Sequence, residues 1–164
     1  MLIAVDPVRS LVVNLFVAQG APPAHAEIVA NHLIESSRMG LHSHGLIRVP
    51  QYYDAVASGE IDPKAVPRRE QLGTAISRID GQWGFGQVAA HVAADIACEL
   101  AGANGVSISD AGAVRQARTS TFSNSPQWFT VGRMRYSHER SFVVLGAVNG
   151  EPLSCSAYKP YGHF

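Results

Sequence analysis

The segment "TAISRIDGQWGFGQVAAHVAADIACELAGANGVSIS", residues 74–109, carries the clearest secondary-structure pattern in this chain. Apolar and polar side chains alternate over residues 74–80, as they do in a half-buried strand. A glycine-containing turn at 81–86 leads into an alanine-rich apolar run at 87–105, which predicts a helix, and a short strand pattern follows at 106–109. The order strand, helix, strand usually gives a parallel crossover unit, so the fold class predicted is mixed α/β.

The residues before this unit predict helices. Asp6 followed by Pro7 marks a helix start, because a carboxylate can cap the first turn and proline is tolerated there. Apolar side chains then recur at helical spacing until Gly20. Residues 21–40 predict a second helix, which begins near two prolines and is stopped by Gly40.

A third, shorter helix is expected over residues 43–58, with Pro50 either kinking it or lying near its first turn. Residues 59–73 predict a loop, because Pro63 and Pro67 interrupt any regular pattern. The fold expected is therefore a helical N-terminal region followed by the strand, helix and strand.

The last part of the chain differs in character from the rest. Residues 114–141 are rich in Ser, Arg and Thr and show neither a helical stripe nor clean alternation, although residues 142–150 are compatible with a strand and a turn. We therefore divide the chain into a helical region at 1–72, the start of an α/β cofactor-binding domain at 73–113, and an atypical tail at 114–164.

Composition bounds the class of protein. The chain has 164 residues, enough for one domain that buries about 70% of its unfolded surface. Thirteen basic and thirteen acidic side chains cancel, which gives no electrostatic reason to expect nucleic acid or an anionic membrane as a partner. The N-terminus lacks the pattern of a signal peptide, and no apolar run approaches the length of a membrane span. We expect a soluble cytoplasmic protein.

The segment "MGLHSHGLIRVPQYYD", residues 39–54, gathers side chains suited to an anionic substrate. If residues 44–52 form one helix, His44, Arg48 and Tyr52 fall on the same face. Arg48 can hold a carboxylate through two hydrogen bonds, and His44 can give or take a proton near neutral pH. The hydroxyl of Ser43 can orient a histidine or contact a substrate. His42 and His44 without a third ligand do not predict a metal site.

Plainer interpretations of these motifs stay open. Ser43 is also a suitable N-cap for the third helix, with His44 and Arg48 as surface residues. The glycines of residues 81–86 precede a helix, as in phosphate-binding loops, but their order differs from that of a Rossmann unit. A tight turn with close packing of strand against helix is the interpretation we favour for them.

Residues 44–67, "HGLIRVPQYYDAVASGEIDPKAVP", preceded by Ser43 and followed by "IDGQWGFGQVAAHVAADIACELAGANGVSI" at 79–108, resemble the malate/L-lactate dehydrogenase family. That family includes ureidoglycolate, sulfolactate and cyclic-imine carboxylate oxidoreductases. The matching features are Ser-His-Gly, an Arg four residues after the His, then Pro and Tyr, Gly-x-Ile-x-Pro, and Asp-Gly before an alanine-rich helix. The resemblance covers about residues 6–110.

The resemblance implies a non-Rossmann fold, NAD or NADP as cofactor and, for the full-length family, a homodimer. It implies that hydride passes between NAD(P)H and a small 2-oxo or 2-hydroxy acid, or a related imine or ureido acid. Ser43 and His44 would form the catalytic relay, with His44 as the proton donor or acceptor. Arg48 would bind the substrate carboxylate, and Tyr52 would line the substrate site.

The tail departs from the family, which carries a histidine-containing segment and an acidic helix after the second strand. A single-base frameshift near codons 111–115 would account for the break, because a shifted reading of residues 122–131 allows strings such as LELAAMVHG. A truncated pseudogene product and a divergent short protein are the alternatives. Two functions follow: an oxidoreductase of this type whose chain is incomplete, or a catalytically inactive fragment that serves at most as a helical interaction or dimerisation module.

Overall fold

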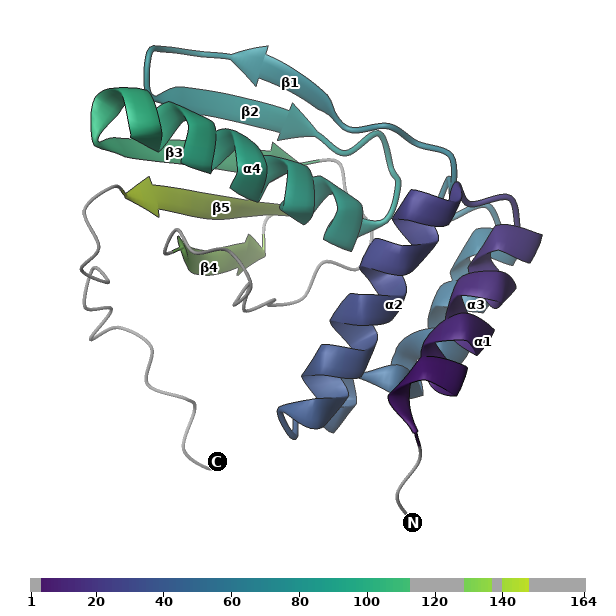
Figure 1. The fold of residues 1–164 in the computed structure, drawn as a ribbon. Coiled ribbons are helices and arrows are strands. Elements are labelled where there is room, and N and C mark those ends of the chain that lie inside the picture. The colour runs from purple at the N-terminus through teal and green to yellow at the C-terminus, as the bar shows by residue number, and fades with distance from the viewer. Residues whose placement is uncertain (1–3, 113–128, 137–139, 148–164) are drawn as a thin grey trace.

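The computed structural model describes residues 4–112 in full and the main chain of residues 129–136 and 140–147. A group of three helices lies beside a sheet that carries a fourth helix on one face (Figure 1). This arrangement confirms the mixed α/β class and the helical N-terminal region.

The three N-terminal helices pack around one apolar cluster. They are α1 at Val5–Ala18, α2 at Pro23–Arg38 and α3 at Val49–Ala57. Their shared core contains Phe16, Leu33 and Tyr52, and it reaches the second half of the chain through Phe85, whose ring meets that of Phe16 edge-on at a centroid distance of 5.5 Å. The first two helices lie where the sequence predicts them, but α1 begins at Val5, so Asp6 lies in its first turn and does not cap it.

The third helix is shorter than the sequence predicts. Two successive 3-10 turns, η1 at His42–His44 and η2 at Leu46–Arg48, occupy the part expected to be α-helical, and α3 begins only at Val49. Pro50 lies in the first turn of α3, where its missing N–H costs no hydrogen bond.

The sheet has five strands in the order β1-β2-β3-β5-β4. The strands are β1 at Arg68–Gln71, β2 at Ile76–Asp80, β3 at Val106–Gly112, β4 at Phe129–Tyr136 and β5 at Arg140–Ala147. Strands β2 and β3 are parallel, with Ser77 opposite Ser109, and every other pair is antiparallel. The predicted strand, helix and strand unit is therefore confirmed.

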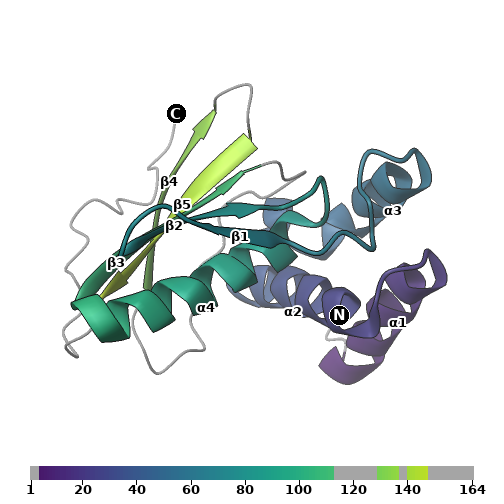
Figure 2. The same cartoon turned by 90° about the horizontal axis from the view of Figure 1, so that it is seen from above.

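Helix α4, at Gly86–Asn104, joins β2 to β3 and lies along one face of the sheet (Figure 2). Its alanines allow a close approach: Ala89, Ala93 and Ala97 are fully buried against Ile79 and Ala111 of the two parallel strands. Gly105, with φ of +80°, ends the helix as predicted, because glycine adopts a left-handed conformation without strain.

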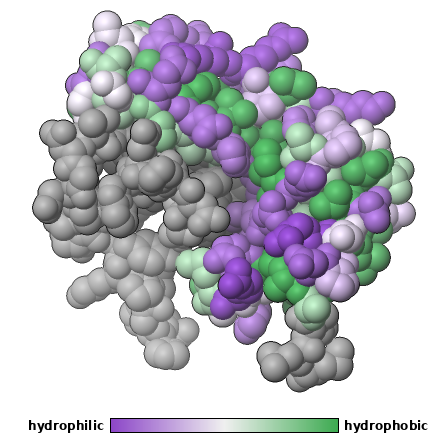
Figure 3. All heavy atoms as spheres, in the orientation of Figure 1, coloured by the Kyte–Doolittle hydropathy of each residue, from purple (hydrophilic) through white to green (hydrophobic). Residues whose placement is uncertain are grey.

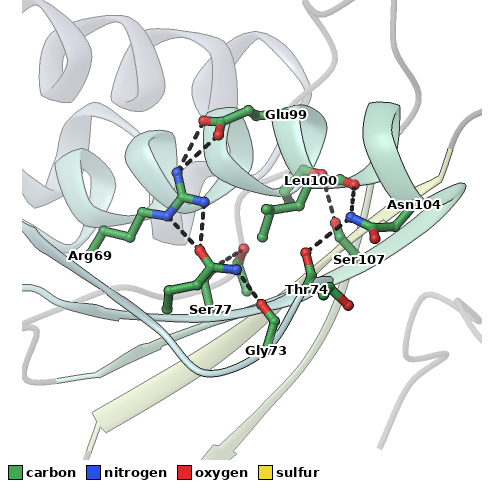
Figure 4. Close-up of polar contacts among 11 residues, drawn as sticks. Arg69, Gly73, Thr74, Ser77, Glu99, Leu100, Asn104 and Ser107 are labelled. Carbon is green, nitrogen blue, oxygen red and sulfur yellow. Dashed lines mark hydrogen bonds and ion pairs between the residues drawn. The ribbon is translucent and has the colours of Figure 1, made fainter.

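Polar contacts hold the C-terminal part of α4 against the strands (Figure 4). Nη1 of Arg69 on β1 donates to both carboxylate oxygens of Glu99 at 3.1 Å. Nδ2 of Asn104 donates to the main-chain oxygen of Thr74 at 3.0 Å. The hydroxyl of Ser107 donates to the main-chain oxygen of Ala97 at 2.6 Å. These contacts hold the β1–β2 hairpin and β3 against the helix.

Two strands lie where the sequence predicts irregular structure. Strand β1 falls in the expected loop at 59–73, and the boundary proposed between residues 72 and 73 lies in the hairpin loop between β1 and β2. Strand β4 falls in the tail, whereas β5 overlaps the strand expected after residue 141. The frameshift hypothesis depends on codons 111–115 and residues 122–131, and of these the residues within 113–128 lie outside the part that the structure describes.

The described surface mixes polar and apolar residues, as the face in Figure 3 shows. Among the helices, Leu11 of α1 is 69% exposed and Ile47 of η2 is 72% exposed. No helix in the described ranges has both the length and the apolar character that crossing a membrane requires.

Candidate active site

The segment between α2 and α3 carries the side chains that the sequence marks for catalysis. Helix α2 is followed by Gly40 at φ of +79°, and the main-chain N–H of Leu41 donates back to the oxygen of Ser36 at 2.9 Å. The chain then forms η1, closed by the N–H of His44 on Leu41 oxygen at 2.9 Å, and η2, closed by the N–H of Arg48 on Gly45 oxygen at 2.9 Å. These short turns place Ser43, His44 and Arg48 at the end of α2.

Ser43 and His44 are in direct contact. The hydroxyl oxygen of Ser43 lies 2.9 Å from Nδ1 of His44, a hydrogen-bond distance whose direction depends on the tautomer of the ring. Ser43 is exposed and His44 is half-buried. A hydroxyl at this position can select one tautomer of the imidazole, as the sequence analysis expects of a relay pair.

Arg48 is attached to the same turn. Its Nε donates to the main-chain oxygen of Ser43 at 2.6 Å, and its Nη1 donates to the side-chain oxygen of Gln51. Arg48 is half-buried, so its guanidinium is oriented by neighbours while remaining accessible to solvent. The structure thus brings together Ser43, His44 and Arg48, which we call the relay cluster.

Tyr52 does not share an exposed face with His44 and Arg48. The 3-10 turns break the continuous helix that such a face requires, and Tyr52 is 4% exposed in the helical core. Its hydroxyl accepts a hydrogen bond of 2.7 Å from Nε2 of Gln87, which is itself 3% exposed on α4. A contribution of Tyr52 to substrate binding would therefore act through the position of α3 on α4.

A further histidine, His32, lies close enough to His44 for its pKa to respond to the charge of that residue. Burial lowers the pKa of His32 on α2 from 6.5 to about 4, and the charge of His44 acts in the same direction. His32 is consequently neutral at neutral pH. The sequence signal for His32 is weak: a histidine interrupts the apolar pattern of its helix, next to Leu33.

The glycine-containing turn before α4 is packed rather than open. A Cβ at Gly84 would lie 2.7 Å from Cβ of Ala65, and the N–H of Gly84 already donates to Gly81 oxygen at 2.9 Å. The positive φ angles belong to Gln82 and Trp83, at 51° and 59°, and the carboxylate of Asp80 holds the turn by accepting from the N–H of Gln82 at 2.9 Å.

This packing matches the tight turn favoured from the sequence. The Cα of Gly84 lies against Ala65, so packing accounts for the glycine at this position. In the ranges that the structure describes, no three His, Cys, Asp or Glu side chains gather as a metal site needs.

Comparisons with known proteins agree with the resemblance seen in the sequence. The family model described as malate/L-lactate dehydrogenase matches residues 3–120. The chain belongs to the malate/L-lactate dehydrogenase family.

Individual relatives have different substrates in their names. The chain is 39% identical over 95 residues to a Delta(1)-pyrroline-2-carboxylate/Delta(1)-piperideine-2-carboxylate reductase of Pseudomonas syringae pv. tomato, a match that covers 58% of this chain and 28% of the reductase. It is 37% identical over 105 residues to a malate dehydrogenase of Pyrococcus abyssi, covering 63% of this chain and 28% of that enzyme.

Solved structures give the same answer for the fold. Malate dehydrogenase from Pyrococcus horikoshii OT3 superposes with a TM-score of 0.68 at 28% identity, over 71% of this chain and 33% of that one. Sulfolactate dehydrogenase from Methanocaldococcus jannaschii gives a TM-score of 0.67 at 29% identity, over 70% and 33% of the two chains. The chain therefore spans about a third of the length of the relatives that it matches.

Proposed function

We propose that this chain supplies the proton-transfer and carboxylate-binding part of an oxidoreductase that acts on a small 2-oxo or 2-hydroxy acid, or on a related imine. The observation that carries the proposal is the geometry of the relay cluster. Ser43 hydroxyl lies 2.9 Å from Nδ1 of His44, while the main-chain oxygen of the same residue accepts from Arg48 at 2.6 Å. A proton donor and a carboxylate-binding group are thus fixed to one residue.

The chemistry assigns a role to each member of the cluster. Reduction at a carbonyl carbon leaves an alkoxide, which must be protonated, and His44 is the group suited to supply that proton near neutral pH. Ser43 positions the imidazole through Nδ1. The guanidinium of Arg48 binds the carboxylate and holds the reacting carbon in register with His44.

The substrates named for the relatives share the group that Arg48 would bind. Malate and sulfolactate are 2-hydroxy acids, and the pyrroline and piperideine substrates carry a carboxylate next to a carbon–nitrogen double bond. In each, the carbon that changes oxidation state is bonded directly to a carboxylate. A cluster that pairs a carboxylate ligand with an acid-base group fits this common feature.

The resemblance implies NAD or NADP as the source of hydride and a homodimer as the assembled enzyme. The glycine at residue 84 is explained by its packing on Ala65, so we assign no cofactor contact to this turn. In this proposal residues 1–72 carry the relay cluster, residues 73–113 begin the cofactor-binding domain, and residues 114–164 have no assigned role. The balanced charge is compatible with a small-molecule substrate in the cytoplasm, without nucleic acid or membrane.

The exposed apolar side chains of the helical region favour a second candidate. Leu11 and Ile47 are 69% and 72% exposed, and the chain spans about a third of its relatives' length. A catalytically inactive helical module that associates with another protein through this region would use such side chains.

NADH fluorescence distinguishes the two candidates. We expect the 164-residue chain to change the emission of NADH or NADPH on titration if it acts as an oxidoreductase on its own. If neither nucleotide responds while the chain associates with itself or with another protein, the inactive module is the correct description of this polypeptide.

A further inference from the structure

We propose that Ser37 and Gly45 form a positioning pair that sets the relay cluster in place, with the Ser37 hydroxyl seated against the bare Cα of Gly45 between η1 and η2. The inference rests on the proposed function for its catalytic meaning. Its geometry and its test do not depend on a substrate.

The two residues approach one another more closely than side chains allow. A Cβ built on Gly45 would lie 2.0 Å from Oγ of Ser37, and 3.0 Å from both Cβ and the main-chain nitrogen of Ser37. Gly45 has φ of −97°, outside the left-handed region that favours glycine. The close approach of the α2 side chain is what excludes a larger residue there.

The hydroxyl of Ser37 also makes a hydrogen bond that the turn needs. Leu46 is the first residue of η2, and the first N–H groups of a helix have no partner within it. Oγ of Ser37 accepts the N–H of Leu46 at 2.9 Å in a partly buried position. A serine in the last turn of a helix often donates its hydroxyl to a carbonyl of its own helix. Here the hydroxyl oxygen accepts from η2, a different segment of the chain.

The location of the contact explains its consequence for the cluster. Gly45 and Leu46 lie between His44 and Arg48, so any shift at this point changes the spacing between the proton donor and the carboxylate ligand. The 2.6 Å hydrogen bond from Arg48 to the main-chain oxygen of Ser43 joins the residues on either side of Gly45 and Leu46. Ser37 bonds to Leu46 and packs on Gly45 rather than bonding to a member of the relay cluster, so the role proposed for it is positioning.

The test compares variants of the full 164-residue chain, uniformly labelled with nitrogen-15. Ser37→Ala removes the acceptor of Leu46, Gly45→Ala introduces the Cβ that meets Oγ, and the double variant Ser37→Gly/Gly45→Ala removes both side-chain atoms that oppose that Cβ. Two readouts are recorded by nuclear magnetic resonance: hydrogen exchange at the amide of Leu46, and the ring nitrogen signals of His44, assigned with His44→Asn.

Two control variants are matched in chemistry. Ser58→Ala also removes a partly buried hydroxyl at the end of a helix, where it donates to Ala55 oxygen at 3.2 Å. Gly102→Ala adds a Cβ to a glycine that has nothing within 4 Å of that position. Both should leave the exchange of Leu46 and the signals of His44 as in the parent chain.

We expect Ser37→Ala to speed exchange of the Leu46 amide roughly tenfold, as loss of one hydrogen bond would, and to change the tautomer balance of His44. Gly45→Ala should disturb both readouts more, and the double variant should recover part of the stability that Gly45→Ala loses without recovering slow exchange at Leu46. A role limited to stability would lower the melting temperature and leave the His44 signals unchanged.

Unchanged His44 signals in Ser37→Ala would overturn the inference, as would a Gly45→Ala chain that behaves like Gly102→Ala. Neither readout requires an oxo acid or a nucleotide. A chain that shows the expected changes but binds no substrate would therefore contradict the proposed function and leave the positioning pair standing.

Discussion

Nε of Arg48 donates a 2.6 Å hydrogen bond to the main-chain oxygen of Ser43, the residue whose hydroxyl contacts His44. Because the acceptor is a main-chain atom, this bond does not depend on the identity of the side chain at residue 43. The position of the carboxylate ligand and the tautomer of the acid-base group are thus set by two separate atoms of one residue, and substitution can separate them.

Ser43→Ala should change the tautomer balance of His44 while leaving Arg48 in place. The substitution removes the hydroxyl that lies 2.9 Å from Nδ1 but keeps the main-chain oxygen that Nε contacts. The measurement is the ring nitrogen spectrum of His44 together with the Nε–H signal of Arg48, with the exposed Ser10→Ala as control. An Arg48 signal that moves as much as that of His44 would show that the two positions are not separable.

The stability of the chain should depend on pH through His32. Burial lowers the pKa of His32 from 6.5 to about 4 in the folded state. Between these two pH values the unfolded state therefore binds a proton at His32 that the folded state does not bind. The free energy of unfolding should therefore fall as pH is lowered from 6.5 towards about 4, and His32 should contribute nothing to this change above that window.

Urea unfolding of the parent chain and of His32→Gln over this pH range checks the prediction. Other titrating groups are common to both chains, so the difference between them isolates His32. We expect the variant to lose less stability than the parent on acidification. Parallel pH profiles for the two chains would mean that His32 titrates normally in the folded state.

Tyr52→Phe should destabilise the fold rather than remove a substrate contact. The hydroxyl of Tyr52 accepts from Nε2 of Gln87, and both residues are at least 96% buried, at 4% and 3% exposed. Loss of the acceptor leaves a buried amide donor unpaired, which costs about 1–3 kcal/mol. The prediction is checked by urea unfolding of the Tyr52→Phe variant and by its affinity for L-malate. A lower affinity with unchanged stability would show that Tyr52 contacts the substrate.

The two parallel strands should show energetic coupling through a serine pair. The hydroxyls of Ser77 and Ser109, both fully buried, lie 2.8 Å apart at paired register positions. Each single change to alanine leaves the other hydroxyl without this partner and should cost about 1–3 kcal/mol. A double-mutant cycle by urea unfolding should give a cost for the double variant that is smaller than the sum, whereas strict additivity would show that the two hydroxyls stabilise the sheet independently.

Much of the fold follows from local pattern. The unit at 74–109 is predictable because the strands alternate, the helix is uniformly rich in alanine, and Gly105 stops it. Strand β1 is not predictable in this way, because all four of its residues are exposed and polar, and its conformation depends on pairing with β2.

The candidate site also has a part that the local sequence predicts and a part that depends on tertiary contacts. Ser43, His44 and Arg48 lie within six residues of one another, so their proximity is a property of the sequence. The break of the third helix into 3-10 turns coincides with a tertiary contact of Ser37 with Gly45, and the spacing of side chains in residues 43–58 does not predict that contact. The same break sends Tyr52 into the core, and the proximity of His32 to His44 likewise arises from the packing of α2 on η1.

The most direct test of the proposed function is the affinity of the chain for L-malate, measured by isothermal titration calorimetry with the parent, Arg48→Lys and Arg38→Lys. Lysine cannot reproduce the two-point contact of a guanidinium with a carboxylate, so Arg48→Lys should weaken binding by about tenfold or more. Arg38, an exposed residue that pairs with Glu35 at 3.1 Å, should tolerate the same change without loss. Equal affinity of all three chains for L-malate, or no binding by the parent, would contradict the assignment of the relay cluster to a carboxylate-bearing substrate.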